Sequence, residues 1–252
     1  VKSKEEIEVM QQACDITAKA FRRCLATVKP GMYEYQVQAE IDYVFKQNNA
    51  TGHAYAPIIA GGKNACCLHY SKNQSQLHDG DLLLFDIGCE YLNYASDLSR
   101  TIPINGTFTQ RQKQCYNAVL RVMKQLQELY RPGHCINEIN ETTHRMMEQE
   151  MIQLGLFTEE DVKKQDPNAP LERRYLMHGM SHHIGLDVHD SIDKFKAFEP
   201  GMILTCEPGI YIREEGIGIR IENDLLITEG EPINLFEGLP IEVEEIEAAM
   251  QR

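Results

Sequence analysis

A weak internal repeat limits what this 252-residue chain can fold into more than any other feature of its sequence. The repeat relates VKPGMYEYQVQAEIDYVF, from position 28, to YRPGHCINEINETTHRMM, from position 130, so that Pro30 and Pro132 align 102 positions apart. Apolar residues coincide at this offset, as where Val37 aligns with Ile139. Each copy is typical of a helix, a Pro-Gly turn, a second helix and then a β-rich stretch. The repeat therefore predicts an α+β fold of two similar halves.

Capping signals and helical spacing predict four helices around the two Pro-Gly turns. Ser3 followed by Glu6, and Thr109 followed by Gln112, are capping-box patterns at which helices begin. We expect the helices to cover about residues 3–29, 35–48, 109–130 and 136–154.

Runs rich in β-forming residues follow each helix pair. The first half contains CCLHY (66–70), DLLLFDIG (81–88) and YASDLSRTIPI (94–104), the last two joined by a short polar turn as in a hairpin. The second half contains GLDVHD (185–190), MILTCEPGIYI (202–212) and GIGIRIENDLLI (216–227). The charged, proline-containing insert at 157–173 is predicted to be a surface loop. Because no linker interrupts the chain, residues 1–252 are predicted to form a single domain.

The net charge limits the partners that this chain can bind, and its cysteines indicate the cellular compartment. With 25 Lys and Arg against 38 Asp and Glu, the formal net charge of −13 suits neither nucleic acid nor an anionic membrane surface. No apolar run reaches the roughly 20 residues that a membrane-spanning helix needs. The eight cysteines have neither CxxC pairs nor the spacing of a disulfide framework, which predicts reduced cysteines and a cytoplasmic protein.

Four acidic residues differ from the rest because they lie inside apolar β-strands. They are Asp86 in LLLFDIG, Asp97 in YASDLSR, Glu207 in ILTCEPG and Glu222 in IGIRIEND. A carboxylate buried there needs a cation nearby, since burying it alone is costly. Salt bridges are one explanation, and the candidate arginines are Arg100, Arg213 and Arg220. A divalent metal site is the other, and the presence of two such acids in each half favours it.

Histidines cluster in the Gly-rich stretch HGMSHHIGLDVHD. They are His178, His182, His183 and His189. We expect at least one to be a metal ligand and another to stabilise an oxyanion. Carboxylate and imidazole ligands together suit Mn, Co or Zn.

The sequence lacks the motifs of other catalytic and nucleotide-binding chemistries. GMSHH lacks the second glycine of the GxSxG motif of serine hydrolases. GGKN lacks the Walker A spacing of a phosphate-binding loop, and neither GxGxxG nor HExxH occurs.

Taken together, these motifs resemble those of the pita-bread metallopeptidases (M24 type). The resemblance rests on Asp86 followed eleven residues later by Asp97, and on HGMSHHIGLDVHD, CEPGIYI and GIGIRIEND. Within that superfamily the histidine string is similar to that of the Xaa-Pro aminopeptidases (aminopeptidase P). The resemblance implies the pita-bread (creatinase/aminopeptidase-like) fold, with two pseudo-symmetric α+β halves and antiparallel β-sheet.

The resemblance also implies roles for individual residues. Two divalent metal ions would be held by Asp86, Asp97, His182, Glu207 and Glu222, with Mn²⁺ the first expectation and Co²⁺ or Zn²⁺ the alternatives. The catalytic residues would be Glu207, His189 and His69. Substrate would be bound by Tyr55, His69, His178 and His189. Arg220 and Tyr211 would support the metal ligands from outside.

The implied activity is release of the N-terminal residue from peptides whose second residue is proline, with Glu207 as the proton shuttle. The alternatives are a prolidase, which cleaves Xaa-Pro dipeptides, and a non-catalytic peptide-binding or protein-binding module of the same fold. Family members usually carry a separate N-terminal domain, which we expect this chain to lack, either as a catalytic fragment or as a short member. Whether the chain forms a homo-oligomer is left open.

Overall fold

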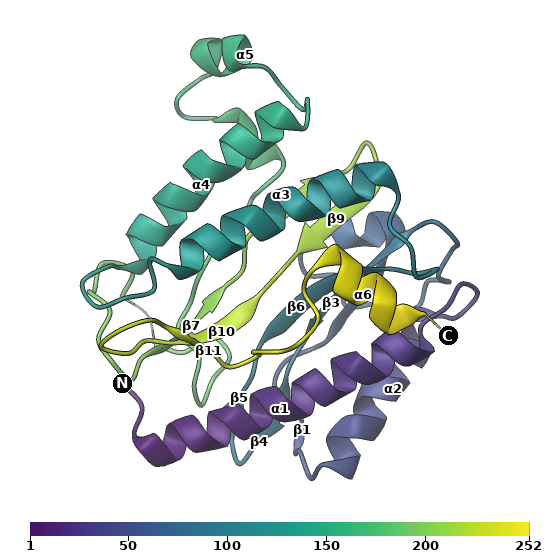
Figure 1. Cartoon of the computed structure of the whole chain (residues 1–252), viewed down its shortest axis with the longest axis vertical. Coiled ribbons are helices and arrows are strands. Elements are labelled where there is room, and N and C mark those ends of the chain that lie inside the picture. Colours follow the sequence, from purple (N-terminus) through teal and green to yellow (C-terminus); the bar gives the residue numbers. More distant parts are fainter. Residues whose placement is uncertain (192, 252) are drawn as a thin grey trace.

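Two helix pairs, one in each half of the chain, lie on the outside of the molecule (Figure 1). The computed structural model describes residues 1–191 and 193–251. The pairs are α1 (Lys4–Thr27) with α2 (Glu34–Gln47) and α3 (Gln110–Gln127) with α4 (Ile136–Gln153). Each pair turns at its Pro-Gly, where Gly31 and Gly133 have φ of +90° and +96°, a conformation that favours glycine. The repeated helix pairs are confirmed, with ends within about three residues of those expected.

The helices begin where their capping signals predict. The Ser3 hydroxyl accepts the N–H of Glu6 at the start of α1, and Thr109 accepts that of Gln112 at the start of α3. Both are complete capping boxes, which satisfy backbone donors that a helix otherwise leaves free.

Antiparallel sheets form the inner layer. In the first half, one sheet contains β2 (Ile58–Gly61), β3 (Leu82–Ile87) and β6 (Leu98–Pro103), and another contains β1 (Gly52–His53), β4 (Cys89–Tyr91) and β5 (Tyr94–Ala95). In the second half, β7 (Ile203–Cys206) pairs with β10 (Asn223–Leu226), which pairs with β11 (Ile233–Asn234). The remaining pair joins β8 (Gly209–Ile212) to β9 (Ile217–Arg220).

The two halves meet where β6 contacts β9 and β10. The Thr101 hydroxyl donates to the backbone oxygen of Arg220 and accepts the N–H of the same residue, each at 3.3 Å. Just beyond β9, the N–H of Glu222 donates to the backbone oxygen of Ser99 at 3.0 Å. The seam therefore brings β-strands from both halves to one place, and the site described below lies there.

Two predicted β-stretches are not strands. Cys66 ends the 3₁₀ helix η1 (Gly62–Cys66). The residues after it, up to Tyr70, continue as a turn, because Cys67 and Tyr70 each donate to a carbonyl three residues earlier. Residues 185–189 form bends, since the N–H groups of Gly185 and Asp190 donate to oxygens of the same loop, and among these described residues Gly185 alone accepts from a strand, at its carbonyl from the Ala95 N–H. Alternation of polar and apolar residues was therefore the wrong guide at 185–190.

The insert at 157–173, predicted to be a loop, contains a short helix. This helix, α5 (Glu159–Lys164), begins at Thr158 in a capping box with Asp161 and has no buried residue. Figure 1 shows it projecting from the end of the molecule. The 3₁₀ helix η2 (Leu171–Arg174) follows and packs on α4.

A final helix, α6 (Val243–Met250), lies between α1 and α3 and contacts both (Figure 1). Val243, Ile246 and Met250 of α6 are buried. In the described part of the chain, no helix is long and apolar enough to cross a membrane.

Candidate metal centre

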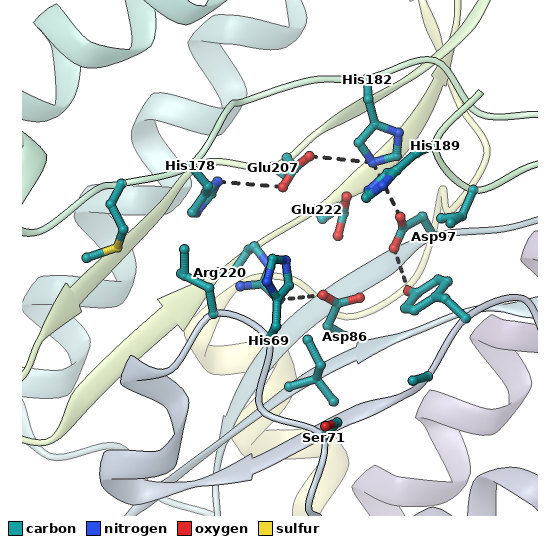
Figure 2. Close-up of a pocket in the computed structure, with 16 residues that line it drawn as sticks. His69, Ser71, Asp86, Asp97, His178, His182, His189, Glu207, Arg220 and Glu222 are labelled. Atoms are coloured by element: carbon teal, nitrogen blue, oxygen red, sulfur yellow. Dashed lines mark hydrogen bonds and ion pairs between the residues drawn. The ribbon is translucent and has the colours of Figure 1, made fainter. Parts of the chain in front are cut away.

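The four acidic residues that the sequence singled out converge on one place at the seam (Figure 2). Asp86 lies within β3, and Asp97 lies between β5 and β6. Glu207 directly follows β7, and Glu222 lies between β9 and β10. Asp97 and Glu222 are 5% and 2% exposed, so their charges are withdrawn from water.

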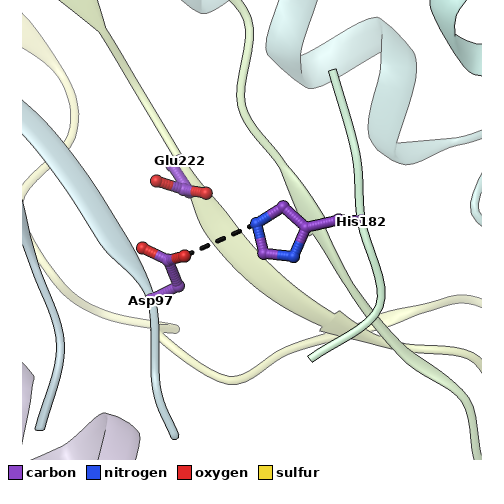
Figure 3. A group of neighbouring side chains, drawn as sticks. All are labelled: Asp97, His182 and Glu222. Carbon is purple, nitrogen blue, oxygen red and sulfur yellow. Dashed lines mark ion pairs between the residues drawn. The ribbon is translucent and has the colours of Figure 1, made fainter. Parts of the chain in front are cut away.

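His182 completes a group with two of these acids. Its Nε2 lies 3.5 Å from Asp97 Oδ2 and 3.6 Å from Glu207 Oε1. One ligand atom each from Asp97, His182 and Glu222 lie within 4.8 Å of one another, close enough to hold a metal ion (Figure 3). The backbone of His182 is fixed on β7, because its N–H donates to the Thr205 hydroxyl and its carbonyl accepts the Thr205 N–H.

The electrostatics of the cluster favour bound positive charge. Burial raises the pKa of Glu207 to about 7, and the charges of Asp97 and Asp86 add to this effect. Burial and the same neighbouring charges raise the pKa of Glu222 well above its usual range. Burial lowers the pKa of His182, but its hydrogen bond to Asp97 and the charge of Glu207 outweigh this and raise it to about 9. Carboxylates so close together cannot all stay charged without a cation.

Arginine neutralises only part of this charge. Arg220 pairs with Asp86, its NH2 donating to Asp86 Oδ2 at 2.5 Å. Arg100 is buried, but it donates to the backbone oxygens of Ser99 and Glu222 and to the Asn223 side chain rather than to an acid. Arg213 is exposed in the turn between β8 and β9.

The salt-bridge explanation therefore holds for one acid of the four. Among the described residues, Asp97, Glu207 and Glu222 form no ion pair with lysine or arginine. Their oxygens and the His182 nitrogen are a donor set that suits a hard or borderline divalent ion, so the residues fit the metal that the sequence predicted.

A chain of hydrogen bonds runs from Arg220 to His178. Arg220 NH1 donates to the Tyr211 hydroxyl at 2.7 Å, and this hydroxyl is 2.8 Å from His178 Nε2. His178 Nδ1 lies 2.7 Å from the Gly179 oxygen, to which it donates, so Nε2 accepts from Tyr211. Burial, with the nearby charge of Arg220, lowers the pKa of His178 to about 3, which keeps the ring neutral.

The cluster opens into a cavity of about 550 Å³, a size typical of small-ligand sites. Ten of the eleven predicted site residues line it, and Tyr211 lies behind them against His178 and Arg220. The apolar side chains that line the cavity are Ala56, Ile58, Leu68, Met177 and Val188. The structure thus brings the predicted residues together around one space.

His69 and His189 lie on different sides of the carboxylates (Figure 2). His189 packs edge to face on His182, with ring centroids 4.5 Å apart, and His69 lines the same cavity. The Tyr55 hydroxyl donates to Asp97 Oδ1 at 2.5 Å.

Two residues at the site were missed by the sequence analysis. Ser99 accepts from Arg220 Nε at 2.8 Å and donates to Glu222 Oε2 at 2.7 Å, so it joins the two halves. It follows Asp97 by two residues, and strand alternation could have placed it on the same face. Asp224, fully buried, accepts the N–H of Asp97 at 3.0 Å, and its acidic side chain in an apolar strand was the same signal that marked the other four.

Known proteins are similar to this chain over nearly its whole length. The model of metallopeptidase family M24 matches residues 8–229. Xaa-Pro aminopeptidase of Escherichia coli (strain K12) is 42% identical over 261 residues, which cover 99% of this chain and 59% of that protein. Xaa-Pro aminopeptidase 3 of Homo sapiens is 35% identical over 258 residues, covering 98% of this chain and 50% of that protein.

Solved structures agree with these matches. Zn-substituted E. coli aminopeptidase P in complex with product gives a TM-score of 0.92 at 42% identity, covering 99% of this chain and 59% of that chain. Proline aminopeptidase P II from Yersinia pestis gives 0.92 at 41% identity, covering 99% and 60%. The chain thus spans 50% to 60% of the length of these relatives. The predicted pita-bread fold is confirmed, and the chain belongs to metallopeptidase family M24.

Proposed function

We propose that this chain is the single catalytic domain of an Xaa-Pro aminopeptidase, which removes the first residue from peptides with proline second. The observation that carries the proposal is the donor group of Asp97, His182 and Glu222, whose ligand atoms lie within 4.8 Å of one another and which line a cavity. The relatives named Xaa-Pro aminopeptidase, at 42% and 35% identity, support the same activity.

The metal ions would be held by Asp86, Asp97, His182, Glu207 and Glu222, with Mn²⁺ as the proposed metal. Two divalent ions held there would supply a hydroxide nucleophile near neutral pH and Lewis-acid polarisation of the scissile carbonyl. The residues around them have the donor chemistry that Mn²⁺, Co²⁺ and Zn²⁺ share.

Glu207 is the group that moves the proton. Its Oε1 lies 3.6 Å from His182 Nε2 and its Oε2 3.7 Å from His178 Nδ1, so its two oxygens face different sides of the site. It takes the proton released by the attacking nucleophile and passes it to the leaving proline nitrogen.

The other residues bind and orient the peptide. His189 and His69 donate hydrogen bonds to the oxyanion that develops on the scissile carbonyl, from different sides of the cluster. Asp97, with the Tyr55 hydroxyl on its Oδ1, binds the free N-terminal amine, which limits cleavage to the first bond. Arg220 and Tyr211 hold Asp86 and His178 in place.

Peptides with proline second are therefore the proposed partners. The net charge of −13 argues against nucleic acid and anionic membranes. Six of the eight cysteines are buried as free thiols, which suits the proposed cytoplasmic location.

The test compares a tripeptide with a dipeptide. We expect the Mn²⁺-loaded protein to cleave Ala-Pro-Ala between Ala and Pro and to cleave Ala-Pro much more slowly, measured by chromatography of the products. Cleavage of the dipeptide alone would identify a prolidase instead. Absence of cleavage and of tightly bound metal in elemental analysis would leave a binding module.

The same assay tests the proton shuttle. Glu207→Ala should lower kcat by at least about a hundredfold, because general acid–base catalysis contributes about that much or more. Glu150→Gln, a change at an acid paired with Arg121 on the outer helices, is the control and should leave turnover unchanged. Near-normal turnover by metal-loaded Glu207→Ala would contradict the assignment.

A further inference from the structure

A buried carboxylate outside the metal centre holds the loop that carries His69. Glu34 is the first residue of α2, and it is fully buried. Its Oε1 accepts the Gly61 N–H and the Asn64 side-chain amide, both at 2.9 Å. Its Oε2 accepts the Tyr70 hydroxyl at 2.6 Å and the Ser75 N–H at 2.8 Å. Every donor belongs to the segment from 61 to 75.

Those donors are spread over the loop at 62–76 and the strand end before it. Gly61 ends β2, before the loop begins, and Ser75 is at its far end, so one carboxylate holds both ends together. Asn64 belongs to η1, and Tyr70 directly follows His69. The backbone adds one more link, because the Glu34 N–H donates to the Ser75 oxygen at 3.0 Å.

The arrangement needs a side chain with two acceptor oxygens, because each oxygen of Glu34 accepts two hydrogen bonds. Among the residues that the structure describes, no cation forms an ion pair with Glu34. Its four hydrogen bonds and the N-terminus of α2 therefore stabilise the carboxylate. An amide at this position keeps one acceptor oxygen and presents an NH₂ group to two donors. Buried donors left without acceptors are costly, so the loop would move to satisfy them.

The position of His69 depends on this loop. The His69 side chain lines the cavity, and within the described residues its ring makes no hydrogen bond or ion pair that would fix it. Its neighbour Tyr70 is tied to Glu34, so the backbone at His69 is set from outside the site.

We propose that Glu34 is a positioning residue, which acts through the loop at 62–76 to set where His69 meets the substrate. The kinetic consequence of this inference rests on the proposed function, whereas its structural consequence rests on the four hydrogen bonds of Glu34. A displacement of about 1 Å in a group that contacts the transition state changes rates strongly.

The experiment is a double-mutant cycle with Mn²⁺-loaded protein and Ala-Pro-Ala. We expect Glu34→Gln to lower kcat/KM about tenfold, mainly through kcat, and to lower it less than about twofold further when His69 is already alanine. The Kd for Mn²⁺, measured by calorimetry, should stay within about twofold of the wild-type value, because Glu34 contacts none of the proposed ligands. An equal fall in both backgrounds, or a loss of Mn²⁺ affinity, would overturn the inference.

Hydrogen exchange provides a readout that needs no activity. In Glu34→Gln, backbone amides at 62–76 should exchange at least about fivefold faster, while those of α3 and α4 stay unchanged. Glu150→Gln is the matched control and should leave the loop at 62–76 unchanged. Unaltered exchange in Glu34→Gln would overturn the inference whatever the activity. If the wild type is inactive but the loop exchanges faster in Glu34→Gln, the result counts only against the proposed aminopeptidase activity.

Discussion

Arg220 shows how one residue can serve both halves of the molecule. Its guanidinium donates to Asp86 on β3, to Ser99 on β6 and to Tyr211 on β8, with donor–acceptor distances of 2.5, 2.8 and 2.7 Å. Three contacts from separate nitrogens need a planar fork, which arginine has and lysine lacks. Arg220 therefore fixes the orientation of Asp86, a proposed metal ligand.

Arg220→Lys should weaken metal binding. The ammonium cannot reach all three partners, so we expect the Kd for Mn²⁺ to rise about tenfold to a hundredfold, the usual cost of losing a group that orients a ligand. Calorimetric titration of the metal-free protein measures this. Arg213→Lys, an exposed change in the same stretch of chain, is the control, and equal affinities for the two variants would contradict the role of Arg220.

The residues of the site differ in how well the sequence could reveal them. The four clustered acids stood out because charge inside an apolar strand needs an explanation, and strand alternation put Arg220 and Glu222 on one face. Ser99 is small and polar and carries no such signal on its own. Distances between side chains from different strands, such as that between His182 and Asp97, depend on tertiary packing and could not be predicted.

At the scale of elements, the helices were the predictable part of the fold. Caps at Ser3 and Thr109 and the two Pro-Gly turns are local signals that need no knowledge of neighbours. The stretch 185–190 has strand-like alternation, but a strand also needs a partner to pair with, and only tertiary structure supplies one. The alternation reflects a loop with Val188 toward the cavity and Leu186 largely exposed.

Two capping boxes of the same kind should differ in their effect on stability. Ser3→Ala removes the cap of α1, whose inner face is buried, so the free energy of unfolding should fall by about 1 kcal/mol. Thr158→Ala removes the cap of α5, which has no buried residue, so α5 can fray without unfolding the molecule. Urea unfolding should show a change below about 0.3 kcal/mol for Thr158→Ala. Equal losses for both variants would contradict this account.

At the scale of the whole molecule, the proposed metal site and the fold depend on each other. Asp86 and Asp97 come from the first half of the repeat, and Glu207 and Glu222 from the second. The acids lie where β6 meets β9 and β10, so their repulsion acts across the contact between the halves. A cation bound there would hold together the same two halves that the repeat predicted.

Metal should therefore stabilise the folded protein. The unfolded chain does not bring these ligands together, so Mn²⁺ at a hundred times its Kd should add about 2.7 kcal/mol to the free energy of unfolding. For a chain of this size, that corresponds to a rise of about 5–10 °C in the Tm of chelator-treated protein, measured by calorimetry. Glu222→Gln removes one donor and should show a smaller rise at the same Mn²⁺ concentration, whereas Glu150→Gln should match wild type. If saturating Mn²⁺ left the Tm of wild type unchanged, or raised that of Glu222→Gln equally, the acids at the seam would not be the metal site.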